Sequence, residues 1–385
     1  MNTAFFGKQL SGPFTIPSGI VATATPIIDY VLRSIPQIGV ITTKSIGLES
    51  RAGYREPVLS QYAPGCFVNA IGLTNPGAHR SAELLGQLEI PADRFLLTSI
   101  FGGNAEEFVA VATLLAPCSD GLELNLSCPH ASGYGMAIGQ DPALVAEIVG
   151  AVAKTVDIPV IAKLTPNTDD IAAIAHAAMD AGAAGLCAIN TVGPGYYTAH
   201  GEPVLSNAVG GMSGKGVLPI GLKCVKEIRE ALDCPIIGCG GISNADDVRA
   251  YRDAGADIFG VGSALVGLTT TQMRDYFAVL DRDLHDNTQL AESLVRYDVD
   301  MQFRSVTLAS NERVSKDIAI LRFDRAIDIK AGEFIFLWIP GLGEKPFSAL
   351  VDDPFTLVVI NLGEFTSRLI KLEPGTEAYV RGPCG

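Results

Sequence analysis

Short apolar runs alternate with longer amphipathic stretches over residues 1–296. The apolar runs, which predict buried strands, lie at 38–43, 95–101, 121–126, 159–164, 185–190, 235–239 and 258–262. Alanine-rich stretches with helical spacing lie at 142–155, 169–181, 218–232 and 245–254, and polar residues at 167–170 and 243–246 are typical of helix N-caps. This alternation predicts right-handed βαβ units and a parallel sheet. About eight strands over this length favour an α/β fold of the (β/α)8 barrel type over an open sheet.

The pattern changes after residue 296. Short apolar runs separated by turn residues lie at 302–309, 318–323, 333–339, 356–361 and 377–381, and no long helical pattern accompanies them. Such spacing predicts a small antiparallel β-barrel. We therefore expect two domains, 1–296 and 297–385. Because no Gly/Ser-rich linker joins them, we expect the two to pack closely.

Composition narrows the class of protein. The chain has 385 residues, 48% of them hydrophobic, so a large core can form. Its 28 Lys and Arg against 42 Asp and Glu argue against nucleic acid as a partner, because phosphate binding needs clustered positive charge. No apolar stretch is long enough to span a membrane, and no signal peptide is evident. The eight cysteines form no C-x-x-C pair, which predicts reduced thiols, no metal site and a cytoplasmic location.

Cys128 lies two residues after the end of the predicted strand 121–126. Pro129 stops that strand because it has no N–H for a ladder, so Cys128 lies at the carboxyl end where barrel active sites form. Asn125 offers a donor and an acceptor nearby. A thiol in this place suggests proton transfer or nucleophilic chemistry, under a glycine-containing loop at 130–140 that we expect to act as a lid. A buried structural cysteine is the alternative.

Polar residues end several of the other predicted strands. Lys44 and Lys163 each close an apolar strand, where a cation could polarise a carbonyl or stabilise a reduced ring. Asn69, Asn125 and Asn190, the last followed by Thr191, would converge on the same face. Amides there suit a neutral, amide-rich heterocycle. A single lysine or asparagine at a strand end could simply be solvated and would not indicate a site. Two lysines and three asparagines at the same end of the barrel together indicate a binding site.

Glycine turns follow the last two predicted strands of the barrel. Gly240 and Gly241 follow strand 235–239, and Gly262 and Ser263 follow the run 258–262. Glycine lets the backbone approach a ligand and direct N–H groups at an anion, and barrels of this type bind phosphate after strands seven and eight. The segment 210–214 is expected to add a third glycine loop. The turn at Ser18 and Gly19 is a weaker signal.

Together these motifs resemble dihydroorotate dehydrogenase. The motifs at 69–77, 125–129, 190–191, 210–214 and 240–242 occur in that family's order, and cysteine at 128 is similar to its soluble, NAD-linked class. The resemblance implies a barrel that binds FMN and oxidises dihydroorotate to orotate, with Cys128 as the base and Lys44 also aiding catalysis. It implies substrate contacts from Asn69, Gly72, Leu73, Asn125, His130, Asn190 and Thr191. It implies FMN contacts from Ser18, Gly19, Lys44, Lys163, Gly214, Gly240, Gly241, Gly262 and Ser263.

One position departs from the family pattern. The family usually has asparagine where this chain has His130, and the run 125–130 also looks like dihydropyrimidine dehydrogenase, which reduces uracil and thymine. The motif at 71–77 is of the dihydroorotate type. A second alternative is a flavin-holding electron-transfer component that does not turn over alone.

The C-terminal region contains the motifs Glu344–Ser348, Gly363–Thr366 and Arg381–Gly385. They resemble the FAD domain of the ferredoxin-reductase family, as found in the electron-transfer subunit that partners NAD-linked dihydroorotate dehydrogenase. The resemblance implies FAD contacts by Lys345, Pro346, Phe347, Ser348, Gly363 and Thr366. Because the domains that normally follow are not in this sequence, we expect FAD binding to be weak or absent. It also implies that a nucleotide-binding domain and a [2Fe–2S] cysteine cluster come from further along a fused protein or from a second chain. The alternative to an FAD domain is a plain β-barrel adaptor. For the assembly, a homodimer or heterotetramer is expected.

Overall fold

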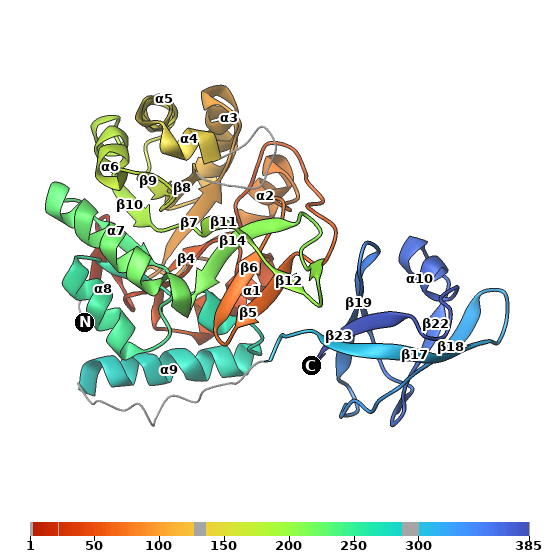
Figure 1. Cartoon of the computed structure of the whole chain (residues 1–385). Coiled ribbons are helices and arrows are strands. Elements are labelled where there is room, and N and C mark those ends of the chain that lie inside the picture. The colour runs from red at the N-terminus through yellow and green to blue at the C-terminus, as the bar shows by residue number, and fades with distance from the viewer. Residues whose placement is uncertain (1–2, 22, 127–135, 287–299, 385) are drawn as a thin grey trace.

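Eight parallel strands form a closed barrel in the computed structural model, which describes residues 3–21, 23–126, 136–286 and 300–384. Figure 1 shows the barrel beside a smaller β domain. In order around the barrel the strands are β3 (Phe14–Ile16), β4 (Ile38–Thr42), β7 (Phe95–Ile100), β8 (Gly121–Asn125), β9 (Val160–Leu164), β10 (Gly185–Ala188), β15 (Ile236–Cys239) and β16 (Ile258–Gly260). Strand β16 pairs with β3 and closes the ring, which confirms the predicted (β/α)8 barrel.

Helices surround the strands. They are α1 (Thr25–Ser34), α2 (Ala78–Leu85), α3 (Ala105–Leu115), the short α4 (Met136–Gln140), α5 (Pro142–Ala153), α6 (Ile171–Asp180), α7 (Leu218–Ala231), α8 (Ala245–Ala254) and α9 (Thr270–Asp286). The predicted N-caps are confirmed at Asp170, which accepts from Ala173 N at 2.9 Å, and at Asn244, which accepts from Asp247 N at 2.9 Å. These caps satisfy amides that a helix start leaves without partners.

The amino end of the barrel is closed by a hairpin of β1 (Thr3–Phe5) and β2 (Lys8–Leu10). Phe5 lies edge-on to Phe95, with ring centroids 5.2 Å apart, and both side chains are buried. A larger apolar cluster packs the strands against the helices, for example Phe14 on Phe277 at 5.7 Å. Because one end is filled in this way, a ligand site is left to the carboxyl ends of the strands.

A four-stranded antiparallel sheet, here called the cap sheet, stands beside the barrel. Its order is β11 (Val192–Tyr196), β14 (Val209–Gly214), β6 (Cys66–Asn69) and β5 (Leu59–Ala63), and a small hairpin of β12 (Thr198–Ala199) and β13 (Glu202–Pro203) extends from it. The prediction of a glycine loop at 210–214 is wrong, because this segment is strand β14. Pairing on both sides, to β6 and β11, supplies the backbone hydrogen bonds that outweigh the low strand propensity of glycine.

Residues 301–384, here called the C-terminal β domain, form an antiparallel sheet with one short helix. The order of its strands is β20 (Gly343–Phe347), β19 (Phe334–Ile339), β23 (Glu377–Cys384), β17 (Arg304–Arg313), β18 (Ile318–Phe323), β22 (Phe355–Ile360) and β21 (Val351–Asp352), with α10 (Glu364–Leu369). Phe323 and Phe355 stack at 5.2 Å in a core of its own. The expected antiparallel β domain is confirmed, as a half-barrel whose described edge strands are β20 and β21.

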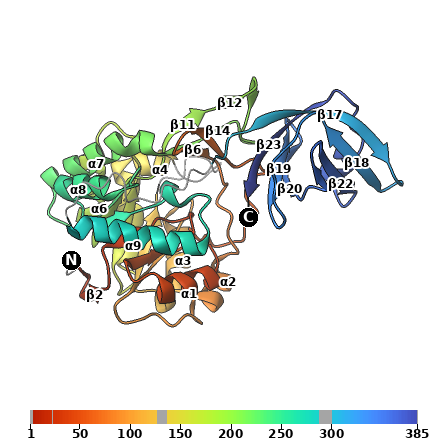
Figure 2. The ribbon, with the colours of Figure 1, turned by 90° about the horizontal axis from the view of Figure 1, so that it is seen from below.

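The two domains are in contact, as expected. Val204, beside β13, is buried in one apolar cluster with Phe303, Trp338 and Tyr379 of the C-terminal β domain. Figures 1 and 2 both show the β12 strand reaching toward that domain. The predicted boundary at 296/297 lies outside the described residues.

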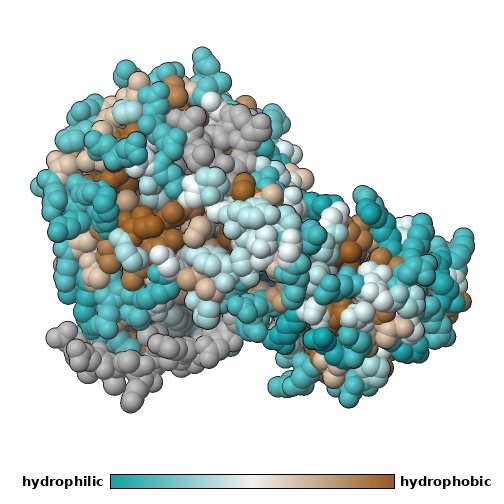
Figure 3. All heavy atoms as spheres, viewed as in Figure 1, coloured by the Kyte–Doolittle hydropathy of each residue, from teal (hydrophilic) through white to brown (hydrophobic). Residues whose placement is uncertain are grey.

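The visible surface is mostly hydrophilic. Figure 3 shows teal side chains over much of both domains and a group of apolar side chains on the barrel. Among the described helices, none is both long enough and apolar enough to cross a bilayer.

Candidate active site

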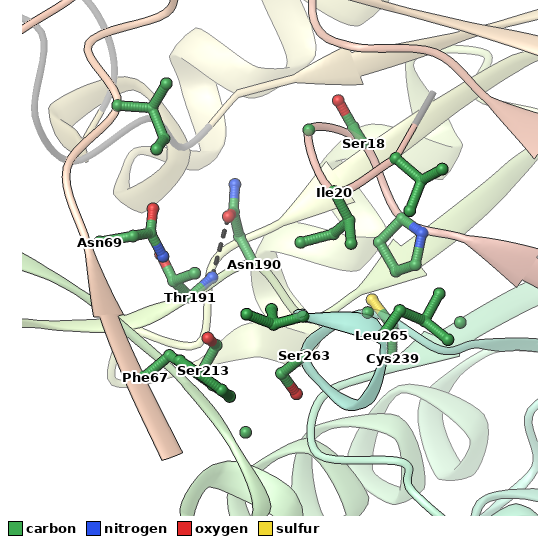
Figure 4. A pocket seen from close by; sticks show the side chains of 18 of the residues that line it. Ser18, Ile20, Phe67, Asn69, Asn190, Thr191, Ser213, Cys239, Ser263 and Leu265 are labelled. Atoms are coloured by element: carbon green, nitrogen blue, oxygen red, sulfur yellow. Dashed lines mark hydrogen bonds between the residues drawn. The ribbon is translucent and has the colours of Figure 1, made fainter. Parts of the chain in front are cut away.

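A cavity of about 550 Å³ lies at the carboxyl ends of the barrel strands, with the cap sheet along one side. This volume is within the range of small-molecule and cofactor sites. In Figure 4, Asn69, Thr191, Phe67 and Ser213 line one side, and Ser18, Ile20, Cys239 and Leu265 line the other. Every site residue predicted in the barrel and described by the structure lines this cavity: Ser18, Gly19, Lys44, Asn69, Gly72, Leu73, Asn125, Lys163, Asn190, Thr191, Gly214, Gly240, Gly241, Gly262 and Ser263.

Three further predictions fall outside the described residues. They concern Cys128, His130 and most of the proposed lid at 130–140. Asn125, the last residue of β8, is described and lines the cavity.

A chain of hydroxyl and amide groups crosses the floor of the site. Ser45 Oγ lies 3.0 Å from Ser18 Oγ and 3.0 Å from Ser99 Oγ, and it accepts from Asn125 Nδ2 at 3.0 Å. Asn125 Oδ1 in turn accepts from Asn190 Nδ2 at 3.1 Å. Sequence reasoning missed Ser45. Its position immediately after Lys44, at a strand end, was the signal that could have found it.

The asparagine side chains are held in fixed orientations. Asn190 Oδ1 accepts from Thr191 N at 2.8 Å, and Asn69 Nδ2 donates to Gly211 O at 3.2 Å in the cap sheet. Because Asn69 is anchored through its Nδ2 and Asn190 through both its Oδ1 and its Nδ2, the two amides keep a defined orientation toward a planar ring.

A buried ion pair lies beneath the cavity. Lys163 Nζ is 3.7 Å from Glu123 Oε1, and the two residues are 5% and 1% exposed. Burial by itself lowers the pKa of Lys163, but the Glu123 carboxylate outweighs it, so the pKa is raised above its ordinary value. Lys163 is therefore a cation at neutral pH, directed at a cavity that has few other charges in its described lining.

Two thiols lie next to this pair. Cys239, which lines the cavity, is 3.8 Å from Cys187 between their sulfurs and also donates to Ile189 O at 3.2 Å. The hydrogen bond from Cys187 lowers the pKa of Cys239, with a further contribution from Lys163. Sequence reasoning used neither thiol, because each sits inside an apolar strand.

The glycine turns after β15 and β16 form the opposite end of the cavity. Gly241 has a φ of +79°, and a Cβ there would lie 2.8 Å from Gly214 O and 2.9 Å from Leu218 N. The Tyr251 hydroxyl donates to Gly240 O at 2.8 Å and fixes the turn. Exposed backbone N–H groups in such a turn form a cradle suited to an anion.

The turn at Gly72 and Leu73 closes the cap-sheet side. Both have positive φ, +79° and +59°. A left-handed leucine is strained and persists only where its surroundings hold it. Asn75 does so in part, because its Nδ2 donates to Leu73 O at 2.8 Å and its Oδ1 accepts from Gly77 N at 2.9 Å.

Comparisons with known proteins agree with this geometry. Residues 1–275 match the sequence model of the family described as dihydroorotate dehydrogenase. The chain belongs to the dihydroorotate dehydrogenase family.

Three of the similar relatives carry the name dihydroorotate dehydrogenase B (NAD(+)), catalytic subunit. That of Pyrococcus horikoshii is 44% identical over 268 residues, 69% of this chain and 86% of the relative. That of Methanocaldococcus jannaschii is 40% identical over 269 residues, which are 69% of this chain and 87% of the relative. That of Methanosarcina mazei is 40% identical over 298 residues, which are 75% of this chain and 94% of the relative.

Members of the dihydroorotate dehydrogenase family are flavin-dependent oxidoreductases that bind FMN. The cavity of this member fits such a group. Gly241 lines the cavity in a turn too tight for a side chain, the kind of backbone that binds phosphate, and buried Lys163 supplies a cation. Glu123 Oε1, buried without a hydrogen-bond partner, gives that cation a fixed counter-charge.

The predicted FAD-contacting residues lie apart from this cavity. Lys345, Pro346 and Phe347 are in β20, with Ser348 just after it, and Gly363 and Thr366 are at the start of α10. Lys345 Nζ forms an ion pair with Glu56 of the barrel at 2.7 Å. The rings of Phe347 and Phe365 are 6.2 Å apart, so β20 and α10 are neighbours. Thr366 Oγ1 accepts from Leu362 N at 2.9 Å and Gly363 N at 3.1 Å, which gives it a role within the fold.

Proposed function

We propose that this protein oxidises (S)-dihydroorotate to orotate, in pyrimidine biosynthesis, with FMN bound in the barrel. One observation carries the proposal. The described residues between 18 and 263 that the resemblance assigns to substrate or FMN all line a single cavity at the carboxyl end of the barrel. Relatives named as catalytic subunits of dihydroorotate dehydrogenase B, 40–44% identical, support the same reaction.

The proposed substrate contacts follow from the anchored amides. Asn69, Asn125 and Asn190, with Thr191, each offer a donor or an acceptor to the edge of a pyrimidine ring. The turn at Gly72 and Leu73 would receive the part of the substrate nearest the cap sheet. Anchored side chains keep the ring in one orientation, which is the main requirement for a stereospecific proton and hydride removal.

Cys128 is the proposed base. As the thiolate it would take the proton from C5 of the substrate, as the family resemblance implies. FMN, when bound, supplies the hydride acceptor. A free thiol has a pKa of about 8.5, so only a small fraction is thiolate at neutral pH. Lys44, beside Gly19 in the cavity lining, is proposed to stabilise negative charge that develops near the flavin.

The proposed flavin contacts divide by chemistry. Lys163 would face the polar edge of the isoalloxazine ring, and the turns at Gly240–Gly241 and Gly262–Ser263 would hold the phosphate. Ser18, Gly19 and Gly214 complete the lining between them. Lys163 lies on β9 and the two glycine turns directly follow β15 and β16, all strands of the closed barrel, so these positions are rigid.

The finer proposal is that electrons leave through the C-terminal β domain toward NAD. The packing of that domain against the cap sheet, which also borders the cavity, supports this arrangement. FAD would bind weakly near β20 and α10, and a partner carrying a [2Fe–2S] centre and an NAD site would complete the route. The seven described cysteines are free, which supports a cytoplasmic location.

Anaerobic reduction of the purified flavoprotein tests the proposal. Dihydroorotate should bleach the flavin absorbance within seconds, whereas uracil with a reductant should not be turned over. Extraction should give FMN, with FAD weak or absent. Bleaching by a dihydropyrimidine such as dihydrouracil but not by dihydroorotate would reject the assignment in favour of a uracil-type enzyme. FMN that neither substrate reduces would favour an electron-transfer component.

A further inference from the structure

Residues 51–59, here called the bridging segment, lie between the cavity and the C-terminal β domain. One side of the segment pairs with residues 70–75, here called the substrate loop. Arg51 N donates to Asn75 O at 2.9 Å, and Asn75 N returns a bond to Arg51 O at 3.1 Å. Tyr54 N donates to Ile71 O at 3.0 Å, and Ala70 N donates to Val58 O at 2.8 Å. These backbone hydrogen bonds to the bridging segment therefore hold the substrate loop in its conformation.

The substrate loop needs this support. It contains Leu73, a buried non-glycine residue with a φ of +59°. It also contains Gly72, where an added Cβ would lie only 2.7 Å from Tyr54 N. Both line the cavity. Because a strained backbone relaxes when its surroundings loosen, a displaced bridging segment would change the cavity wall directly.

The other side of the bridging segment contacts the C-terminal β domain. Arg55 Nη1 donates to two carbonyls of the β19–β20 turn, Gly341 O at 3.2 Å and Leu342 O at 3.1 Å. The Glu56 carboxylate pairs with Lys345 Nζ at 2.7 Å. Successive residues of one segment are thus tied to one strand edge of the neighbouring domain.

A third contact is buried and stronger. Arg381 Nη1 donates to Leu59 O at 2.9 Å, while its guanidinium pairs with Glu344 at 2.6 Å and 2.9 Å. The same guanidinium lies over the rings of Phe303 and Phe336, 5.2 Å and 5.0 Å from their centroids. A planar guanidinium fixed on both sides is a rigid donor, unlike the exposed pair at Glu56. Leu59 itself lines the cavity and pairs with Asn69 in the cap sheet.

We propose that the C-terminal β domain positions the substrate loop through the bridging segment, with Arg55, Glu56 and Arg381 as positioning residues for dihydroorotate binding. The proposal rests on the proposed function for its substrate and on the contacts above for its geometry. A docked domain holds the segment and the loop in the binding conformation. An undocked domain leaves the flavin end of the cavity intact and loosens the substrate end.

Arg55→Gln in the full-length flavoprotein tests the proposal, with Arg80→Gln on α2 as the matched control, since Arg80 pairs only with Glu83 among the described residues. Amide exchange at Tyr54, Ala70 and Asn75 should speed up by about fivefold, the scale of one or two part-exposed charge-assisted hydrogen bonds. The KM for dihydroorotate should rise by a similar factor, with kcat within about twofold and FMN content unchanged. The control should alter none of these.

A second variant disturbs a different part of the domain interface, the apolar cluster around Val204. Val204→Asp places a charge in the buried cluster with Trp338, the only tryptophan of the chain, so undocking is seen directly as a red shift of its fluorescence. The same amides should then exchange faster. Arg381→Met is avoided as the first test because it strands the buried Glu344 carboxylate and endangers folding.

The outcomes separate the two proposals. If Trp338 shows undocking while exchange in the substrate loop is unchanged, the positioning role is overturned. If exchange accelerates but KM does not move, the loop is held by the domain without serving substrate binding, and the inference also fails. A wild-type protein inactive with dihydroorotate rejects the proposed function alone, since the exchange measurement needs no substrate.

Discussion

Replacing Lys163 by methionine should sharply destabilise the barrel. The substitution keeps most of the side-chain volume and removes the charge that faces Glu123 at 3.7 Å. At an effective dielectric constant of about 20, two unit charges at that distance attract by about 4.5 kcal/mol. Because both residues are almost fully buried, water cannot replace the lost partner. Breaking one side of a buried pair costs about 3–5 kcal/mol, and we expect a loss in that range for Lys163→Met.

The double variant Lys163→Met/Glu123→Gln provides the internal control. It removes both charges, so its loss of stability should be clearly smaller than the sum of the two single losses. The assay is urea unfolding of the FMN-free proteins followed by far-UV circular dichroism, which reports the barrel helices. Fluorescence of Trp338 reports the C-terminal β domain together with its docking on the barrel domain. A single-variant loss below about 1 kcal/mol, or strict additivity in the cycle, would refute the buried-pair reasoning.

The pH dependence of this loss has a definite sign. The folded pKa of Lys163 is raised above its ordinary value of 10.5. A lysine with a raised folded pKa contributes its full stabilisation below the unfolded pKa and loses it as pH rises through the folded pKa. As pH rises, the stability difference between wild type and Lys163→Met should therefore persist to about pH 9 and shrink only in stronger alkali. A difference that shrinks as pH rises from about 7 to 9 would contradict the assignment.

Three further predictions concern other parts of the cavity. Ser45→Ala removes the hydroxyl shared by Ser18, Ser99 and Asn125, so orotate should bind about 1–2 kcal/mol more weakly in a flavin absorbance titration; unchanged affinity would exclude a role for the hydroxyl chain. Gly241→Ala should purify with little FMN, since its Cβ would crowd Gly214 O, and a full flavin-to-protein ratio would count against the phosphate cradle. Cys128→Ala should lose orders of magnitude in turnover while Cys128→Ser retains some, and wild-type turnover should climb from about pH 7 to 9; an active alanine variant would show that another group is the base.

The sequence predicted much of the fold because the barrel obeys local rules. Seven of its strands lie within the predominantly apolar runs of the sequence, and the capping residues Asp170 and Asn244 mark the starts of α6 and α8. The three-residue strand β3 carries too little pattern to be recognised. The glycine-rich segment 210–214 has the composition of a loop and becomes a strand only because β6 and β11 flank it. The predicted roles of the cavity residues, unlike their shared location, stay predictions.

By itself the sequence determined the barrel, the β domain and the residue types at the strand ends, because strand and helix periodicity and turn chemistry depend only on near neighbours. The tertiary structure decided what depends on residues far apart in the chain. Ser45 becomes a junction because three other elements converge on its hydroxyl, and Glu123 becomes the counter-charge of Lys163 because β8 pairs with β9. The bridging segment acquires its second set of partners from residues almost 300 positions away, as in the pair of Glu56 with Lys345. Such contacts arise only when the closed barrel and the docked domain bring the segments together, and no local pattern encodes them.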